Sequence, residues 1–225
     1  MKLLLNRIFL ENAMTTEKKR VITISRQLAS GGAYIGHLVA RKLGYKYVER
    51  EVLYAAAREI GVEVRDIADQ DEKKCGFLES MLKSFVFGTP EAAYVPPSRK
   101  PVYDEELFSA ECLIIRQIAE SHNTVIVGHA GFAVLSGWPN VFNVYIHAPK
   151  VFRIARLKEF HALSEEQALA EIDEADSRRE KYLRRWTERN WHDARNYHLC
   201  LNAQATGFEA AADTIIGLSQ KMKQT

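Results

Sequence analysis

The chain has 225 residues, 47% of them hydrophobic, which suffices for one α/β domain with an inserted lobe or for two small domains. Its 31 basic residues nearly balance its 29 acidic ones, and the net charge of +2 indicates neither a nucleic acid nor an anionic membrane as a partner. The three cysteines are far apart and include no C-x-x-C pair, so neither a disulfide framework nor a zinc cluster is indicated, and a cytoplasmic location is expected.

Residues 1–20 are expected to form a flexible N-terminal extension. Their apolar stretch is interrupted by Asn6 and Arg7 and lacks a small-residue cleavage site, and no later run is long enough to span a membrane. Met14, which precedes the polar stretch TTEKKR, is an alternative start to Met1. N-terminal sequencing of the native protein distinguishes the two starts.

From residue 21 onward, apolar runs rich in β-branched and aromatic residues alternate with segments of helical periodicity. The runs lack the strict alternation of half-exposed strands and are separated by helices, so we predict a parallel sheet covered on both faces. Ser164 and Gln167 form a capping box, which marks the start of a helix. The predicted strands are 21–25, 45–48, 124–128, 141–147 and 198–202, and the predicted helices are 35–43, 51–60, 105–120, 150–159, 164–185 and 207–222.

The stretch GTPEAAYVPPSRKP, residues 88–101, interrupts this alternation because it contains four of the six prolines. A segment this rich in proline cannot form an interior strand or helix. Two interpretations stay open: a plain surface loop, and a mobile segment that closes over a substrate.

The first strand is followed by LASGGAY, residues 28–34, and then by a helix. Consecutive backbone N–H groups at a helix N-terminus bind anions, and the small side chains here would let a phosphate come close. A glycine pair between a strand and a helix is more often structural, however, so this pattern alone does not establish a phosphate site.

The loop lacks the lysine of a P-loop. In a P-loop that lysine neutralises the β- and γ-phosphates, and the hydroxyl residue that follows it binds Mg²⁺. We place Gly32 and Tyr34 at those two positions. The nearest cation that could substitute for the lysine is Arg26, at the other end of the loop.

Two further stretches carry candidate functional residues. The predicted strand in TVIVGHAG, residues 124–131, runs into Gly128 and His129, and open parallel sheets bind ligands outside the carboxyl ends of their strands. His129 taken alone is more often structural than catalytic. Residues 176–189 contain six basic and three acidic side chains, an excess that suits a phosphate clamp, although a mixed-charge helix is usually a solvated face.

Together these residues resemble the cytidylate kinase-like family, a branch of the nucleoside monophosphate kinases with the P-loop fold. The resemblance runs from about Val21 to the C-terminus and is carried by ITISRQLASGGAYIGHLVARKLGYKYVERE, VIVGHAG and DSRREKYLRRWTERNWHDARNYHLCLN. It implies an α/β P-loop-type three-layer fold with a five-stranded parallel sheet. The implied single domain has a core of 21–50, 104–172 and 196–225, an inserted helical monophosphate-binding lobe at about 51–103, and a helical lid at about 173–195.

The resemblance also implies an activity, the transfer of the γ-phosphate of ATP, with Mg²⁺, to a nucleoside monophosphate such as CMP or dCMP. No protein metal ligand is implied, and a homodimer stays open. The implied catalytic residues are Arg178, Arg179 and Arg184, the implied donor-binding residues are Arg26, Ser30, Gly31, Gly32, Ala33 and Tyr34, and the implied acceptor-binding residues are Glu49, Arg50, Gly128 and His129.

Two alternatives to this activity stay open. Relatives often have an arginine where this chain has Ala33, and commonly have Gly-Arg where it has Gly128-His129. The loss of these cations favours a nucleotide-binding regulatory protein that does not turn over. A reshaped pocket around residues 75–103 would instead favour a small-molecule kinase with a different acceptor. A nucleic-acid-binding role has the least support, because the charge is near neutral and no recognition motif is present.

Overall fold

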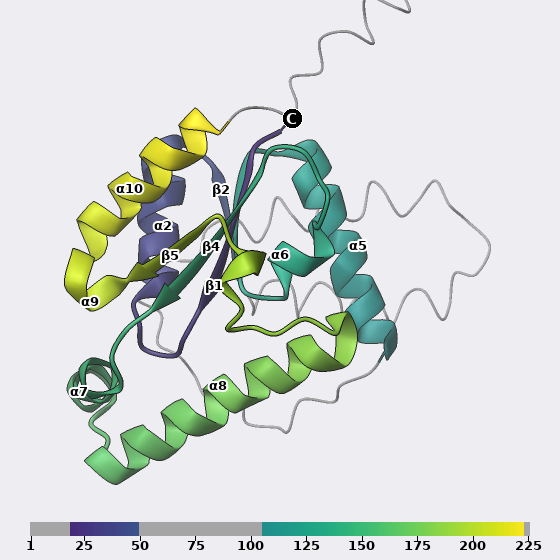
Figure 1. Cartoon of the computed structure of the whole chain (residues 1–225). Helices are drawn as coiled ribbons and strands as arrows, with labels where there is room; N and C mark the ends of the chain where they lie inside the picture. Colours follow the sequence, from purple (N-terminus) through teal and green to yellow (C-terminus); the bar gives the residue numbers. More distant parts are fainter. Residues whose placement is uncertain (1–18, 50–104, 223–225) are drawn as a thin grey trace, which may run out of the picture.

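The computed structural model describes residues 19–49 and 105–222 (Figure 1). Several expectations fall outside the described residues: most of the N-terminal extension, Arg50, the predicted helix 51–60, the inserted lobe at about 51–103 and the proline-rich stretch 88–101.

The described strands form one parallel sheet with the order β2-β3-β1-β4-β5. The central strand pairs on both sides, with Val21 opposite Thr124 in β3 and opposite Val141 in β4. The carboxyl ends of the strands therefore meet at one edge, as the sequence predicted, and the predicted fold class is confirmed. The strands are β1 (Val21–Arg26), β2 (Lys46–Glu49), β3 (Thr124–Val127), β4 (Val141–His147) and β5 (Leu199–Asn202).

Helices cover both faces of this sheet (Figure 1). One apolar cluster joins the sheet to α2 and α10, and a second joins it to α5 and α6. None of the helices in the described part of the chain is long and apolar enough to cross a membrane. The helices are α2 (Gly32–Leu43), α5 (Glu105–Ser121), α6 (Gly131–Val134), α7 (Lys150–His161), α8 (Glu165–Thr187), η1 (Ala194–Asn196), α9 (Ala203–Thr206) and α10 (Phe208–Lys221).

The 23-residue helix α8 lies across the carboxyl end of the sheet (Figure 1). Its predicted capping box is confirmed, since Ser164 and Gln167 each accept a hydrogen bond from the other's backbone N–H group. Buried residues along α8 pack against α7 and against Leu28 of the loop after β1. The segment predicted as a lid, about 173–195, thus begins inside a continuous helix, and its role as a lid stays a prediction.

Candidate functional site

The first candidate feature is the loop that joins β1 to α2. Gly31 is the N-cap of α2, with φ 87°, and Ile35 N donates to Gly31 O over 2.9 Å. The N–H groups of Gly32, Ala33 and Tyr34 therefore precede the first intrahelical hydrogen bond, and this first turn contains no acidic residue. N–H groups at the positive end of a helix dipole suit the oxygens of a phosphate.

Gly31 has to be a glycine for two reasons. Its φ of 87° is strained for any residue with a side chain, and an added Cβ would lie 2.5 Å from Cε1 of Phe208. Phe208 thus packs directly on the loop, and Tyr34, which is 37% exposed, meets it edge-on with the ring centroids 5.8 Å apart. The Arg156 guanidinium lies 4.8 Å from the Phe208 ring centroid, and burial lowers the pKa of this arginine. This side of the loop is therefore aromatic and cationic.

Arg26 occupies the space beside the position of the missing lysine. A Cβ added to Gly32 would lie 2.4 Å from Cβ of Arg26, so the stem of the arginine fills the place where a residue-32 side chain would begin. The guanidinium continues to β3, where a Cβ added to Gly128 would lie 2.4 Å from its Nη1. The residue that directly follows Gly32 is Ala33, so the hydroxyl position of a P-loop falls at Ala33 and not at Tyr34, and Ala33 has no side-chain hydroxyl to offer a metal.

The Arg26 guanidinium, at the end of β1, forms an ion pair with Glu49, at the end of β2. Its Nη2 donates to Oε1 of Glu49 over 3.1 Å, and the two side chains are only 11% and 25% exposed. Tyr47 donates a hydrogen bond to Oε2 of Glu49 over 2.8 Å, and its hydroxyl also lies 3.2 Å from the carbonyl oxygen of Ala33. Arg26, predicted to bind the donor, and Glu49, predicted to bind the acceptor, thus belong to one cluster, which weakens Arg26 as a simple substitute for lysine.

We expect that restoring the lysine by Gly32→Lys will not increase ATP affinity and will lower the free energy of unfolding by about 1–3 kcal/mol, because the new Cβ overlaps the Arg26 stem. Urea denaturation and ATP titration measure the two effects. Gly217→Lys is the matched control, since a Cβ there meets nothing within 4 Å. A Gly32→Lys protein as stable as the wild type would contradict this account.

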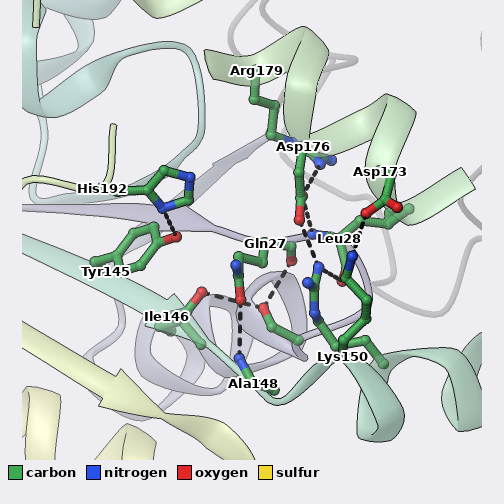
Figure 2. A network of polar contacts seen from close by, with 12 residues as sticks. Gln27, Leu28, Tyr145, Ile146, Ala148, Lys150, Asp173, Asp176, Arg179 and His192 are labelled. Carbon is green, nitrogen blue, oxygen red and sulfur yellow. Dashed lines mark hydrogen bonds and ion pairs between the residues drawn. The ribbon is translucent and has the colours of Figure 1, made fainter. Parts of the chain in front are cut away.

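Loop residues 27–30 are held from two sides, as Figure 2 shows for most of these contacts. On one side the backbone of Gln27 donates to Ile146 O over 3.1 Å, and its side-chain oxygen accepts from Ala148 N over 3.2 Å. Ser30 is fully buried and its hydroxyl donates to Gln27 O over 2.8 Å, so this predicted donor-binding residue shapes the loop from within. The loop is therefore tied to the end of β4.

On the other side, the loop is hydrogen-bonded to an ion pair that joins α7 to α8 (Figure 2). Leu28 N donates to Oδ1 of Asp176 over 2.9 Å, and Arg153 donates to Leu28 O over 3.3 Å and to Oδ2 of Asp176 over 2.6 Å. The Arg153 side chain is only 4% exposed. Asp176 lies in a motif that the sequence singled out, whereas Arg153 carried no sequence signal because its partners are distant in the chain.

The three predicted catalytic arginines of α8 differ in their surroundings. Arg178 and Arg184 each pair with an acidic residue one turn earlier in the helix, and Arg184 is 68% exposed. The Nη1 of Arg179 lies 3.3 Å from Oδ1 of Asp176, the oxygen that also accepts from Leu28 N, and its side chain is 17% exposed. Arg179 is thus linked to the loop through the Asp176 carboxylate.

The segment after α8 is docked on the sheet. Trp191 is 4% exposed and meets Tyr145 of β4 edge-on, with the ring centroids 5.7 Å apart. The Tyr197 hydroxyl donates to Trp191 O over 2.8 Å, and burial raises the pKa of both tyrosines well above the usual range. In this structure, therefore, the end of the predicted lid segment is packed against the core.

His129 lies just after the end of β3 and next to Gly128 in the chain. Its Nδ1 lies 3.1 Å from Oε2 of Glu111 in α5, and Tyr182 of α8 donates to the same oxygen. Glu111 carried no sequence signal, because an acidic residue in a helix is ordinarily solvated. The structure thus brings together Arg26, Glu49 and Gly128 of the predicted site, with His129 beside them.

The loop suits the phosphates of ATP better than it suits a metal ion. The N–H groups of Gly32, Ala33 and Tyr34 at the start of α2 are hydrogen-bond donors only, which suits phosphate oxygens and not a cation. Among the described residues, no group of three or more His, Cys, Asp or Glu side chains is arranged to hold a metal. Mg²⁺ commonly keeps several waters and is held largely by substrate phosphates, so it would arrive with ATP.

Comparison with known proteins bears on the fold. A structure of an uncharacterized protein from Eubacterium ventriosum is similar, with a TM-score of 0.67 at 20% identity over 91% of this chain and 100% of that one, which shows a shared fold. A shikimate kinase from Bacteroides thetaiotaomicron (TM-score 0.47, 11% identity, 89% and 98% coverage) and a gluconokinase from Sinorhizobium meliloti (TM-score 0.46, 12% identity, 90% and 95% coverage) also match. A search of the curated proteins found no match.

The sequence itself matches one family model. That model is described as the cytidylate kinase-like family, and it covers residues 21–205, which include the loop, the β3 end and the whole of α8. Because the match extends over far more than half of the chain, the protein belongs to the cytidylate kinase-like family.

Proposed function

We propose that the protein transfers the γ-phosphate of ATP to a nucleoside monophosphate, with CMP or dCMP as the acceptor. Membership of the family supports a phosphotransferase. The observation that carries the proposal further is the loop after β1, where N–H groups lie at the N-terminus of α2 and where Leu28 N and Arg179 share one oxygen of Asp176. The donor phosphates and the Arg179 guanidinium, which would stabilise the phosphoryl group during transfer, would thereby be held next to each other.

In phosphoryl transfer, the protein contributes mainly by positioning the reactants and by placing positive charge near the equatorial oxygens of the phosphoryl group that moves. The N–H groups of Gly32 and Ala33 would hold the donor phosphates, and Mg²⁺, bound to ATP, would supply further charge. Arg179 would exchange its long contact with Asp176 for the phosphoryl oxygens. Asp176 would keep its hydrogen bond with Leu28 N, so the loop would stay in place while the arginine moves.

The pairing of Arg26 with Glu49 favours a second function, because Glu49 offsets the charge of the arginine that is best placed to replace the missing lysine. A protein that binds ATP without turnover would fit this pairing. The family resemblance and the position of Arg179 favour transfer over this alternative.

The test is ADP formation from Mg-ATP with CMP, dCMP, UMP, AMP and GMP, beside a control without acceptor. A signal selective for CMP or dCMP supports the proposal. Folded protein that binds ATP but forms no ADP with any of the five would contradict it, and would favour either the binding protein or a kinase for a different acceptor. Calorimetric titration of ATP into the same samples separates these results from a failure to bind the donor.

A further inference from the structure

The edge strand β5 is joined to β4 through an imidazole ring, which belongs to the residue directly before β5 (Figure 1). His198 N donates to Asn143 O over 2.8 Å, and Asn143 N donates to Nδ1 of His198, also over 2.8 Å. The His198 ring also stacks on Phe142 of β4, with the ring centroids 5.5 Å apart and the planes 12° apart. Two of the contacts that hold the start of β5 on β4 therefore depend on one imidazole.

The hydrogen bond from Asn143 requires that Nδ1 of His198 carry no proton. A backbone N–H group can only donate, so its partner has to offer a lone pair. A neutral imidazole offers one and carries its proton on the other nitrogen, which here is Nε2, whereas a charged imidazole donates from both nitrogens. Protonation of His198 would thus replace this hydrogen bond with two N–H groups that face each other.

The surroundings of the ring do not favour its charged form. Its neighbours on β4, Phe142 and Asn143, do not titrate, and α9, which packs against β5, has no titratable side chain. Burial lowers the pKa of His198 below its ordinary value of 6.5, and no charged group contributes to this shift. Burial raises the pKa of Tyr197 and that of Cys200, so both stay uncharged in the range where histidine titrates.

The ring lies between two segments whose positions depend on it. Tyr197, the preceding residue, stacks on Tyr145 with the ring centroids 5.1 Å apart, and its hydroxyl donates to Trp191 O over 2.8 Å. The following residues lead along β5 to Asn202, whose side chain caps α9. Loss of the Asn143 contact would therefore loosen the segment after α8 on one side and the start of β5 on the other.

We propose that His198 is a pH-sensitive switch, which as a neutral imidazole holds the start of β5 and the segment 188–197 on the sheet and as an imidazolium releases them. This inference does not depend on the proposed function. Because the folded state lowers the pKa of His198, it binds fewer protons than the unfolded state. The stabilisation is therefore fully present above pH 6.5 and is lost as the pH falls below that value.

The test combines an NMR titration of the imidazole nitrogens with amide hydrogen exchange of the full chain, both from slightly alkaline to mildly acidic pH. Nδ1 of His198 should be unprotonated at neutral pH, and the ring should titrate below pH 6.5, with the Asn143 amide signal following the same curve. After correction for the intrinsic effect of pH, exchange at Asn143 and at the start of β5 should become about 2- to 10-fold faster as the ring is charged, which corresponds to the loss of one hydrogen bond.

Two variants separate the acceptor from the stacking. His198→Asn places an uncharged acceptor oxygen at about the position of Nδ1, so it should keep slow exchange at every pH and lose the pH dependence. His198→Phe can still stack on Phe142 but accepts no hydrogen bond, so it should exchange about 2- to 10-fold faster than the wild type at neutral pH. Thermal denaturation shows whether each variant is folded, and if His198→Phe is not, the titration and His198→Asn decide.

His192 is the matched control, because it lies in the same segment, with its Nδ1 3.1 Å from the Tyr145 hydroxyl. A hydroxyl can either donate or accept, so protonation of His192 does not have to break that contact, and His192→Asn should retain the pH dependence. The inference would be overturned by a His198 ring that titrates at or above pH 6.5, or by a pH dependence that persists in His198→Asn. A pH dependence that disappears in His192→Asn would also overturn it and would assign the effect to His192.

Discussion

Arg179→Ala is expected to lower kcat by about 10²- to 10³-fold, because one charge-assisted donor to the transferring phosphoryl group contributes about 3–4 kcal/mol to the transition state. The free energy of unfolding should fall by about 1–3 kcal/mol, because the Arg179 side chain is only 17% exposed and contacts the Asp176 carboxylate at 3.3 Å, so the variant should remain folded. Steady-state kinetics and urea denaturation measure the two quantities on the same protein.

Two further variants make this expectation specific. Arg179→Lys keeps the charge but loses the planar fork of donors, so we expect a kcat between those of the wild type and the alanine variant. Arg195→Ala removes an arginine of the same region that is 90% exposed and pairs only locally with Asp193, and it should leave kcat unchanged. An Arg179→Ala enzyme with wild-type kcat would remove this residue from the reaction.

Asp176→Ala is expected to lower the free energy of unfolding by about 3–5 kcal/mol. Arg153, whose side chain is only 4% exposed, would keep its charge but lose its partner, and Leu28 N would lose its hydrogen bond. ATP affinity should fall as well, because the loop after β1, which is predicted to bind the phosphates, would lose its hydrogen bond to α8. Urea denaturation and calorimetric titration with ATP measure these losses.

Asp173 provides the control for this prediction. It lies one turn earlier in α8 and pairs with Lys150 at 2.7 Å, but its side chain is 57% exposed, so Asp173→Ala should cost less than about 1 kcal/mol. Arg153→Met combined with Asp176→Ala should be more stable than Asp176→Ala alone, because no unpaired buried charge remains. Equal losses for Asp173→Ala and Asp176→Ala would show that burial of the pair does not determine its contribution.

The strands and long helices were predictable because their signals are local. Runs such as VITIS and TVIVG are too apolar and too rich in β-branched residues to lie at the surface, and the capping box at Ser164 fixes the start of α8 by contacts within three residues. The helices α6 and α9 were not predicted, because each has only four residues and shows too little of a 3.6-residue period.

The candidate site was only partly predictable. The glycines of the loop predict a close approach of the backbone to a ligand, which stays a prediction, while the structure shows Gly31 packed closely against Phe208. The pairing of Arg26 with Glu49 could not be foreseen, because it depends on the order of β2, β3 and β1 across the sheet. Glu111 was missed for a similar reason, since only the packing of α5 against β3 buries it beside His129.

By itself the sequence determined the family, the parallel sheet and the position of the loop that is predicted to bind phosphate, because each rests on residues that are neighbours in the chain or repeat with a regular period. The tertiary structure alone decided which charges are paired and that Arg179 shares the Asp176 carboxylate with the loop. Leu28 and Asp176 are separated by 148 positions, and His129 and Glu111 by 18, so their contacts exist only once the helices pack on the sheet. Burial then increases the contribution of these pairs to stability, because a charged group removed from water is destabilising unless it keeps its partner.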